Sequence, residues 1–312
     1  MKSVHKLTEG AIFLAAFAVL LLMTIYIPLL GSVTNLFIPL PFIMFAAKND
    51  RKSSLVFLVG ALLISLIVGT VMAIPLSLLY GLTGLVIGDF IREKKKRLAG
   101  YIAGTIVFLI TLVAQYAVSV AFFEIDVIKE SIQLFEKSVD QTFQMMEKLG
   151  QPLDAAVVEQ FNTGIQMLVT LVPSVFVMAS CLMVFVIELI SFPILRRFGF
   201  DVPRWKPFRE LSLPKSFLWY YLIVLIAFLL FNPEQGTYWY SALLNLSFIL
   251  QFFLIIQGLS FVYFFSYEKG IPKFVPILIT VFLPILLYIV RILGIIDLGF
   301  NLRKWVIEKS KK

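Results

Sequence analysis

Gly84-Leu-Val-Ile-Gly88, followed by Gly100-Tyr-Ile-Ala-Gly104 and preceded by Ala11-Ile-Phe-Leu-Ala15, is the stretch that decides the fold of this chain. Each of the three motifs lies in an apolar run and places two small residues four positions apart, on one face of a helix. Small residues at this spacing let helix backbones approach closely, and such packing drives helix association in lipid. Residues 9–104 therefore predict a tight bundle of transmembrane helices.

The composition agrees with a membrane protein. The chain has 312 residues, of which 60% are hydrophobic and 15% charged, and its mean hydropathy is +0.95. Soluble domains carry roughly 25% charged residues, so most of this surface has to face lipid. We expect an all-α integral membrane protein, a polytopic bundle of eight to nine transmembrane helices.

Nine apolar segments support this expectation. They lie at about 10–30, 35–47, 54–70, 72–91, 99–123, 165–191, 216–231, 238–266 and 274–296. The second follows an uncharged stretch, Gly31–Asn35, interpreted as a turn, and it contains Pro39 and Pro41. Its length of about 20 Å falls short of a core of about 30 Å. It is therefore strained, partly unwound or re-entrant, and Thr34–Pro41 forms either a plain proline kink or a pocket wall.

Residues 124–163 differ from the rest of the chain, because they carry eight acidic residues and three lysines. Apolar residues recur at intervals of three and four, which predicts one stripe of an amphipathic helix: Ile125, Ile128, Ile132, Phe135, Val139, Phe143, Met146 and Leu149. Gly150-Gln-Pro152 breaks the pattern before a second helix. We expect a helical hairpin outside the membrane. Its stripe packs on itself, dimerises or lies on lipid, and the repulsion between its acids and anionic headgroups favours packing on protein over lipid.

Three regions follow from this division. We predict a core at 1–195 that includes the hairpin insert, a basic cytoplasmic loop at 196–215, and additional transmembrane helices with a basic tail at 216–312. The loops at 48–52, 92–97 and 196–215 hold fourteen Lys and Arg residues, which predicts that they and the N-terminus face the cytoplasm of a bacterial inner membrane. Nine spans would put the basic tail outside, so we expect a segment after 215 to bend back or to lie on the surface.

The sequence argues against most catalytic and metal chemistry. His5 is the single histidine and Cys181 the single cysteine, so histidine-based catalysis and Cys/His metal sites are almost excluded. No nucleotide-binding motif occurs either. We expect no enzyme activity, no catalytic residue, no metal and no cofactor. The formal net charge of +8 is accounted for by loops that anchor the chain at the membrane, so we expect no nucleic-acid partner.

Polar residues within the apolar segments are the candidate site residues. Glu188 and Arg291 are intramembrane charges, a class that is functional by default. Both lie near segment ends, and we favour two independent charges that reach the membrane surface; the alternative is that they pair, which requires the last segment to run in the opposite direction. Asn35 and Gln115 are possible ligand-facing groups. They could equally form interhelical hydrogen bonds, as could Asn245, Gln251 and Gln257.

Residues 7–97 resemble the substrate-binding S component of energy-coupling-factor (ECF) vitamin transporters. The resemblance is carried by the Ala-rich first helix, by Pro39-Leu-Pro41 after a short second helix, by a basic turn, and by Gly88-Asp-Phe-Ile-Arg92. It implies that segments one to six form a six-helix core, and that Ala11 and Ala15 contact a transmembrane coupling subunit, which acts with ATPases. No vitamin-binding motif of that family is present.

The whole chain resembles the uncharacterised bacterial YybS-type membrane family, through Gln257-Gly-Leu and Gly294-Ile-Ile-Asp-Leu-Gly-Phe-Asn-Leu-Arg303. That family is grouped by fold with S components and with the rod-shape protein MreD. Two functions follow as expectations. The first is a solute-binding membrane component of an energy-coupled transporter. The second is a non-transporting scaffold that binds cell-envelope proteins.

Overall fold

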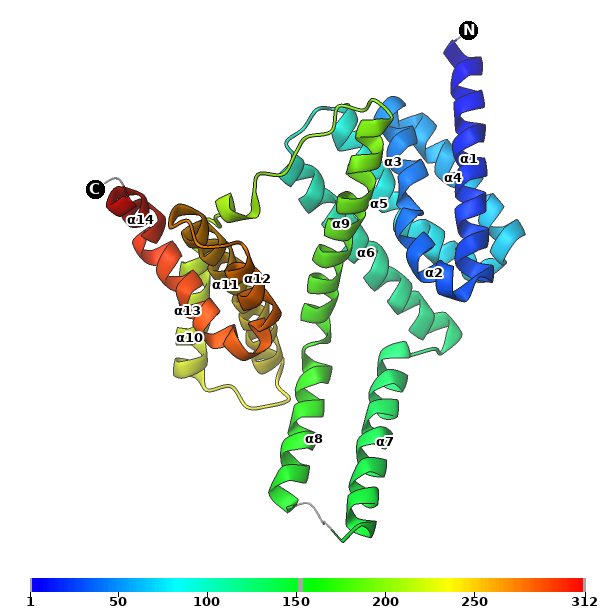
Figure 1. The fold of residues 1–312 in the computed structure, drawn as a ribbon. Helices are drawn as coiled ribbons and strands as arrows, with labels where there is room; N and C mark the ends of the chain where they lie inside the picture. The colour runs from blue at the N-terminus through cyan, green and yellow to red at the C-terminus, as the bar shows by residue number, and fades with distance from the viewer. Residues whose placement is uncertain (1, 151–153, 311–312) are drawn as a thin grey trace. The chain divides into compact units, whose positions relative to one another are not determined.

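The computed structural model of the protein describes residues 2–150 and 154–310, and helices make up all regular structure in these ranges (Figure 1). The helices of the first half are α1 (Lys2–Tyr26), α2 (Pro28–Thr34), η1 (Asn35–Phe37), α3 (Pro39–Lys48), α4 (Arg51–Gly69), η2 (Val71–Ala73), α5 (Ile74–Arg92) and α6 (Arg97–Phe123). Those of the second half are α7 (Val127–Lys148), α8 (Ala155–Thr170), α9 (Val172–Arg197), η3 (Phe208–Glu210), α10 (Ser216–Phe231), α11 (Tyr238–Glu268), α12 (Phe274–Val281), α13 (Leu283–Phe300) and α14 (Leu302–Ser310).

The polytopic helical membrane fold predicted from the sequence is confirmed. Eight helical stretches of the described residues are long and apolar enough to cross a membrane, and α10 is a shorter apolar helix. The chain divides into two compact units. One comprises Met1–Leu134 and Phe176–Arg204, and the other comprises Phe135–Val175 and Trp205–Lys312. We describe each unit by itself.

In the first unit, the second apolar segment is longer than predicted. The chain reverses at Ile27, and helix α2 then runs through Gly31–Thr34, so the turn predicted at Gly31–Asn35 is wrong. Pro28 at the first position of α2 favours this start, because proline is preorganised for a helix N-terminus. The segment becomes a 21-residue stretch, Pro28–Lys48. The irregular backbone predicted within it is the 3₁₀ turn η1.

Close packing of α3 against α5 holds the core of this unit. A methyl group added at Gly84 would lie 2.8 Å from the carbonyl oxygen of Pro39, and one added at Gly88 would lie 2.5 Å from that of Ile43. The Gly84/Gly88 pair therefore packs inside the unit, where the two backbones touch. Phe17 and Phe42 fill the interior next to them and meet edge to face at 5.2 Å.

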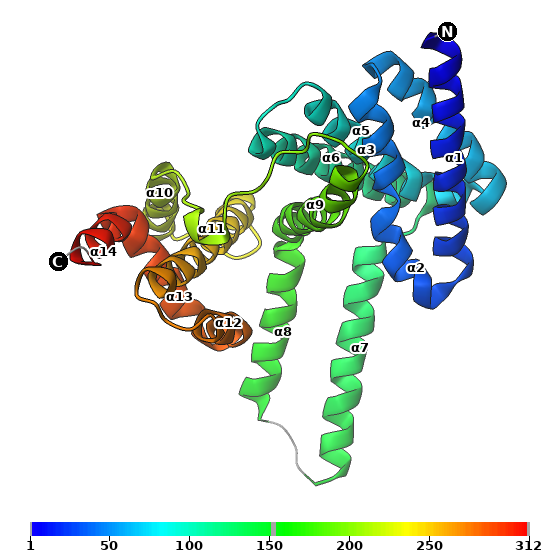
Figure 2. The same ribbon diagram turned by 45° about the horizontal axis from the view of Figure 1, so that its top comes forward.

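Helices α7 and α8 form the predicted hairpin, and they lie side by side in both views (Figures 1 and 2). Their contact includes an edge-to-face pair, Phe143 with Phe161, with ring centroids 5.4 Å apart. The hairpin is longer than predicted, because α8 continues to Thr170 and α9 begins at Val172. The stripe thus packs partly on the hairpin itself.

In the second unit, the last apolar segment folds back on itself. Helix α11 ends at Glu268, and after α13 the chain returns to the same end, where Val306 packs with Phe261 and Phe264. Both ends of residues 274–300 therefore lie at the C-terminal end of α11, and the direction changes at Phe282 between α12 and α13. One of the two predicted alternatives, a late segment that bends back, is found.

Candidate functional site

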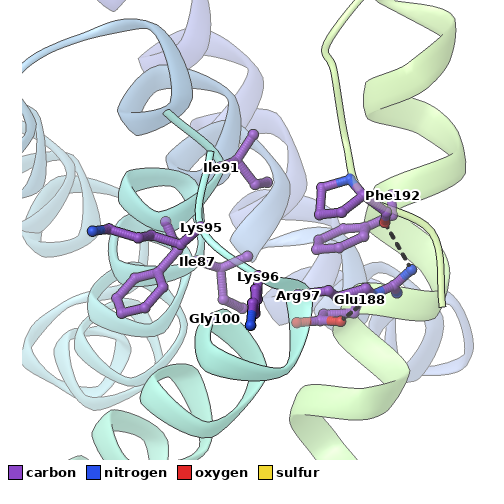
Figure 3. Close-up of a pocket in the computed structure, with 10 residues that line it drawn as sticks. Ile87, Ile91, Lys95, Lys96, Arg97, Gly100, Glu188 and Phe192 are labelled. Carbon is purple, nitrogen blue, oxygen red and sulfur yellow. Dashed lines mark hydrogen bonds and ion pairs between the residues drawn. The ribbon is translucent and has the colours of Figure 1, made fainter. Parts of the chain in front are cut away.

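A buried ion pair is the first candidate site, in the first unit. Arg97 Nε donates to Glu188 Oε2 at 3.0 Å, and the two side chains are 9% and 1% exposed. Arg97 Nη1 also donates to the carbonyl oxygen of Pro203 at 3.1 Å, and its guanidinium lies 4.3 Å from the ring centroid of Phe192 (Figure 3). Glu188 is thus buried against an arginine, and the interpretation of Glu188 as an independent charge that reaches the membrane surface is wrong.

A small cavity borders this pair. It is lined by Ile87, Gly100 and Phe192 together with Arg97 and Glu188, and its volume is about 10 Å³. Such a volume holds about one water molecule. The pair therefore joins α6 to α9 and leaves no room beside it for an organic solute.

The end of the first unit that carries the basic loops is tied by surface ion pairs. Arg51 bridges Asp89 at 2.8 Å and Glu93 at 2.7 Å. Lys6 Nζ donates to Asp50 Oδ1 at 2.7 Å. This hydrogen bond, together with those from the Ser53 hydroxyl and amide, holds the pKa of the Asp50 carboxyl well below its usual range. Both signs of charge alternate here, so the patch has no strong preference for an anion or a cation.

The predicted ligand-facing residues bridge helices. Asn35 Nδ2 donates to the hydroxyl of Tyr80 at 3.0 Å, and its buried Oδ1 accepts no hydrogen bond from the described residues. Gln115 Nε2 donates to the carbonyl oxygen of Pro75 at 2.8 Å. Each residue thus contacts a different part of α5.

Ala11 and Ala15 lie on α1, and both side chains are exposed on the surface of the first unit. Phe17, on the opposite face of the same helix, is completely buried. The exposed face of α1 is therefore open to lipid or to another helix.

The second unit contains a buried polar network that we did not predict. Gln257 Oε1 accepts from the amide of Leu213 at 2.8 Å, and its Nε2 donates to Asp297 Oδ2 at 2.6 Å. Arg303 Nε donates to the same Asp297 oxygen at 3.0 Å. Gln257 is completely buried and Asp297 is 4% exposed. The network joins α11, α13 and the start of α14 to the chain that precedes α10.

Arg303 completes the network on the other side. Its Nη1 donates to the carbonyl oxygen of Arg209 at 2.9 Å, and its Nη2 donates to that of Leu211 at 2.8 Å and to Ser260 Oγ at 3.1 Å. Ser260 Oγ in turn donates to the carbonyl oxygen of Leu211 at 2.7 Å. All three guanidinium nitrogens of Arg303 donate to protein acceptors, so this arrangement acts as a clamp on the 208–213 segment rather than as a binding site.

The sequence contained a signal for this clamp. Gln257-Gly258 and Gly294-Ile-Ile-Asp297 each place a polar residue within one turn of a glycine. In the structure the two glycines are the point where α11 and α13 touch. Polar residues next to such a contact are close enough to bond across it. Asp297 was missed because it lies just beyond the predicted end of the last apolar segment.

Arg291 and the remaining polar residues also have partners on neighbouring helices. Arg291 Nη1 donates to Gln251 Oε1, within the second unit. Asn245 Nδ2 donates to the carbonyl oxygen of Thr170 at 2.7 Å, and its Oδ1 accepts from Ser174 Oγ at 2.6 Å. Glu188 and Arg291 have separate partners in separate units. Among residues 2–150 and 154–310, no three His, Cys, Asp or Glu side chains come together as a metal site would require.

Comparison with known proteins gives a family and one close relative. Residues 15–298 match the family model described as Predicted membrane protein (DUF2232). The chain is 31% identical over 317 residues to the uncharacterized protein YybS of Bacillus subtilis (strain 168), covering 98% of this chain and 100% of that protein. No solved structure matches the chain.

Proposed function

We propose that this chain, which belongs to the DUF2232 family of predicted membrane proteins, is a non-enzymatic membrane scaffold that binds cell-envelope proteins. The observation that carries this proposal is the surface of the α7–α8 hairpin. None of the described residues of α7 is buried, although the helix has a pronounced apolar stripe. Apolar side chains on a helix outside the membrane are unfavourable in water unless a partner covers them.

The hairpin exposes both apolar and acidic residues. Met145 is 66% exposed, Leu149 72% and Phe161 46%, and Glu147 and Glu159 are exposed on the same two helices. The acids disfavour contact with anionic headgroups. A protein surface that combines an apolar groove with basic residues fits this hairpin better than lipid does.

The orientation follows from the positive charges. The 208–213 segment and α14 lie at one end of the second unit because Arg303 joins them. The basic 196–215 loop and the basic tail therefore share one side, which we assign to the cytoplasm together with the N-terminus. With this assignment, we expect the hairpin, which lies between segments five and six, on the extracytoplasmic side of a bacterial inner membrane.

A pull-down from native membranes tests this function. Because Phe143 faces Phe161, residues 140–164 can be replaced by a short Gly-Ser linker that rejoins the two helices at one level. We expect the full chain to retain extracytoplasmic or membrane partners that the shortened chain loses. Recovery of the same proteins by both chains, at equal yield, would contradict the hairpin as the binding element.

A second candidate function is favoured by the exposure of Ala11 and Ala15 on α1. In it, the first unit is a solute-binding component that contacts a coupling membrane subunit with ATPases. The same pull-down separates the two functions. ATPases that co-purify with the full chain, and that are lost in Ala11→Trp and Ala15→Trp but kept in the hairpin-shortened chain, would establish the transporter function instead of the scaffold.

A further inference from the structure

Arg291 is a charged residue in α13, a helix long and apolar enough to lie in the membrane. Its partner Gln251 lies on α11, a helix of 31 residues and therefore about 46 Å long. Tyr238 and Trp239 at one end of α11 and Tyr267 at the other mark the two interfaces. Gln251 is near the midpoint between these belts, about 20 Å from the start of the helix. The guanidinium of Arg291 consequently lies near the bilayer centre.

The contacts of Arg291 do not neutralise its charge. It donates to Gln251 Oε1, and Gln251 Nε2 donates onward to Ser247 Oγ at 2.8 Å. Its guanidinium also lies 5.0 Å from the ring centroid of Tyr288. Within the part of the chain that the structure describes, no carboxylate forms an ion pair with Arg291. Arginine stays protonated in proteins, so the charge needs a counter-ion from elsewhere.

A second copy of this chain has no suitable counter-ion among the described spans. The acids within those spans already pair with basic residues of the same chain: Glu9 with Lys48, Asp89 with Arg51 and Arg92, Glu188 with Arg97, and Asp297 with Arg303. Glu268 closes α11 and is about 26 Å along the helix from Gln251. The counter-ion therefore belongs to a different molecule.

The surface beside Arg291 is a helix face. Ile285 is 76% exposed, Tyr288 72%, Ile289 59% and Ile292 52%. Their spacing puts them on one side of α13, and Arg291 borders that side and is half-buried. An apolar helix face with one charge at its edge is complementary to another transmembrane helix that carries the opposite charge.

We propose that this α13 face binds a transmembrane helix of a different protein, which carries an Asp or Glu near its middle and forms an ion pair with Arg291. The contact is additional to the one proposed for the α7–α8 hairpin, because it lies within the bilayer. Removal of residues 140–164 leaves it intact, and its failure leaves the hairpin contact standing.

In vivo photo-crosslinking of the full chain tests the proposal. A benzoylphenylalanine at Ile289 reports on the α13 face, and one at Ile223, 60% exposed on α10, is the matched control on another lipid-facing helix. We expect an adduct at Ile289 with a membrane protein whose crosslinked span contains a mid-depth Asp or Glu. Arg291→Gln should reduce this adduct about tenfold, whereas Arg291→Lys should keep it.

Exchanging the charges of Arg291 and of the partner's carboxylate tests whether the two form an ion pair. Arg291→Glu should abolish the adduct, and a Lys in place of the partner's carboxylate should restore it. Ile292→Trp leaves the charge of Arg291 in place and should reduce the adduct, because the larger side chain excludes the partner helix. This variant tests the α13 face even if the variants of Arg291 do not accumulate in the membrane. An adduct unchanged in Arg291→Gln, an adduct only with a second copy or with lipid, or a partner span without a carboxylate would each overturn the proposal.

Discussion

Gly258 in α11 and Gly294 in α13 bring two helix backbones into direct contact. A methyl group added at Gly258 would lie 1.8 Å from the carbonyl oxygen of Val290, and one added at Gly294 would lie 2.0 Å from that of Leu254. Neither atom can move aside as a side chain could, because both belong to helical backbone. This contact holds the re-entrant α12–α13 segment against α11.

The glycine contact makes the first prediction. Gly258→Ala and Gly294→Ala should each destabilise the protein by at least about 1–3 kcal/mol, because the helices have to separate. Thermal unfolding of the detergent-solubilised protein measures the change. Gly164→Ala is the matched control, because nothing lies within 4 Å of the added methyl group, and alanine is favoured over glycine within a helix by about 0.5–1 kcal/mol. Equal melting temperatures for Gly258→Ala and the original protein would contradict the contact.

Hydropathy predicted the helices well, because each apolar run is long and ends at charges or at Pro and Gly. Residues 216–231 were predicted as one segment, and α10 has those bounds. The fold-back at Phe282 was missed, because we predicted residues 274–296 as one apolar segment and did not use Pro284, at the start of α13, as a helix break. That turn depends on contacts at the far end, between Val306 and the last turns of α11.

The partners of buried charges could not be predicted from the sequence either. Glu188 pairs with Arg97, which is 91 positions away on another helix. Nothing in either local pattern connects the two, since Arg97 closes a run of basic residues that has the ordinary appearance of a cytoplasmic loop. Packing of α6 against α9 selects this arginine from among its neighbours. Pairs of site residues of this kind can be identified only from the tertiary structure.

The Arg97–Glu188 pair gives the second prediction. Glu188→Leu and Arg97→Leu should each cost about 3–5 kcal/mol, because each leaves an uncompensated buried charge. The double variant should recover part of that loss, because no charge is then left alone. Unfolding of the three variants in one detergent gives the coupling free energy. Strictly additive losses would show that the two side chains do not interact.

The Arg303 clamp gives the third prediction. Arg303→Lys cannot reproduce the four acceptors that the guanidinium contacts, so we expect α14 and the 208–213 segment to loosen. Limited proteolysis in membranes should then cut after residues of α14 at least about tenfold faster, as a loss of about 1.4 kcal/mol in local stability implies. Lys304→Gln, on the exposed side of the same helix, should leave the rate unchanged. Equal rates of proteolysis for Arg303→Lys and Lys304→Gln would mean that the clamp does not hold α14.

The re-entrant segment gives the last prediction, which concerns membrane topology. Single cysteines at Lys206, Glu234 and Lys304, introduced after Cys181→Ser, report the loop before α10, the turn between α10 and α11, and the tail. All three positions are exposed. Because α12 and α13 return the chain to the C-terminal end of α11, Lys206→Cys and Lys304→Cys should react with an impermeant maleimide only from the cytoplasmic side. Glu234→Cys should react from the outside. If Lys304→Cys and Glu234→Cys were labelled from the same side, residues 274–300 would cross the membrane, and the basic tail would lie opposite the basic loop against the distribution of charge.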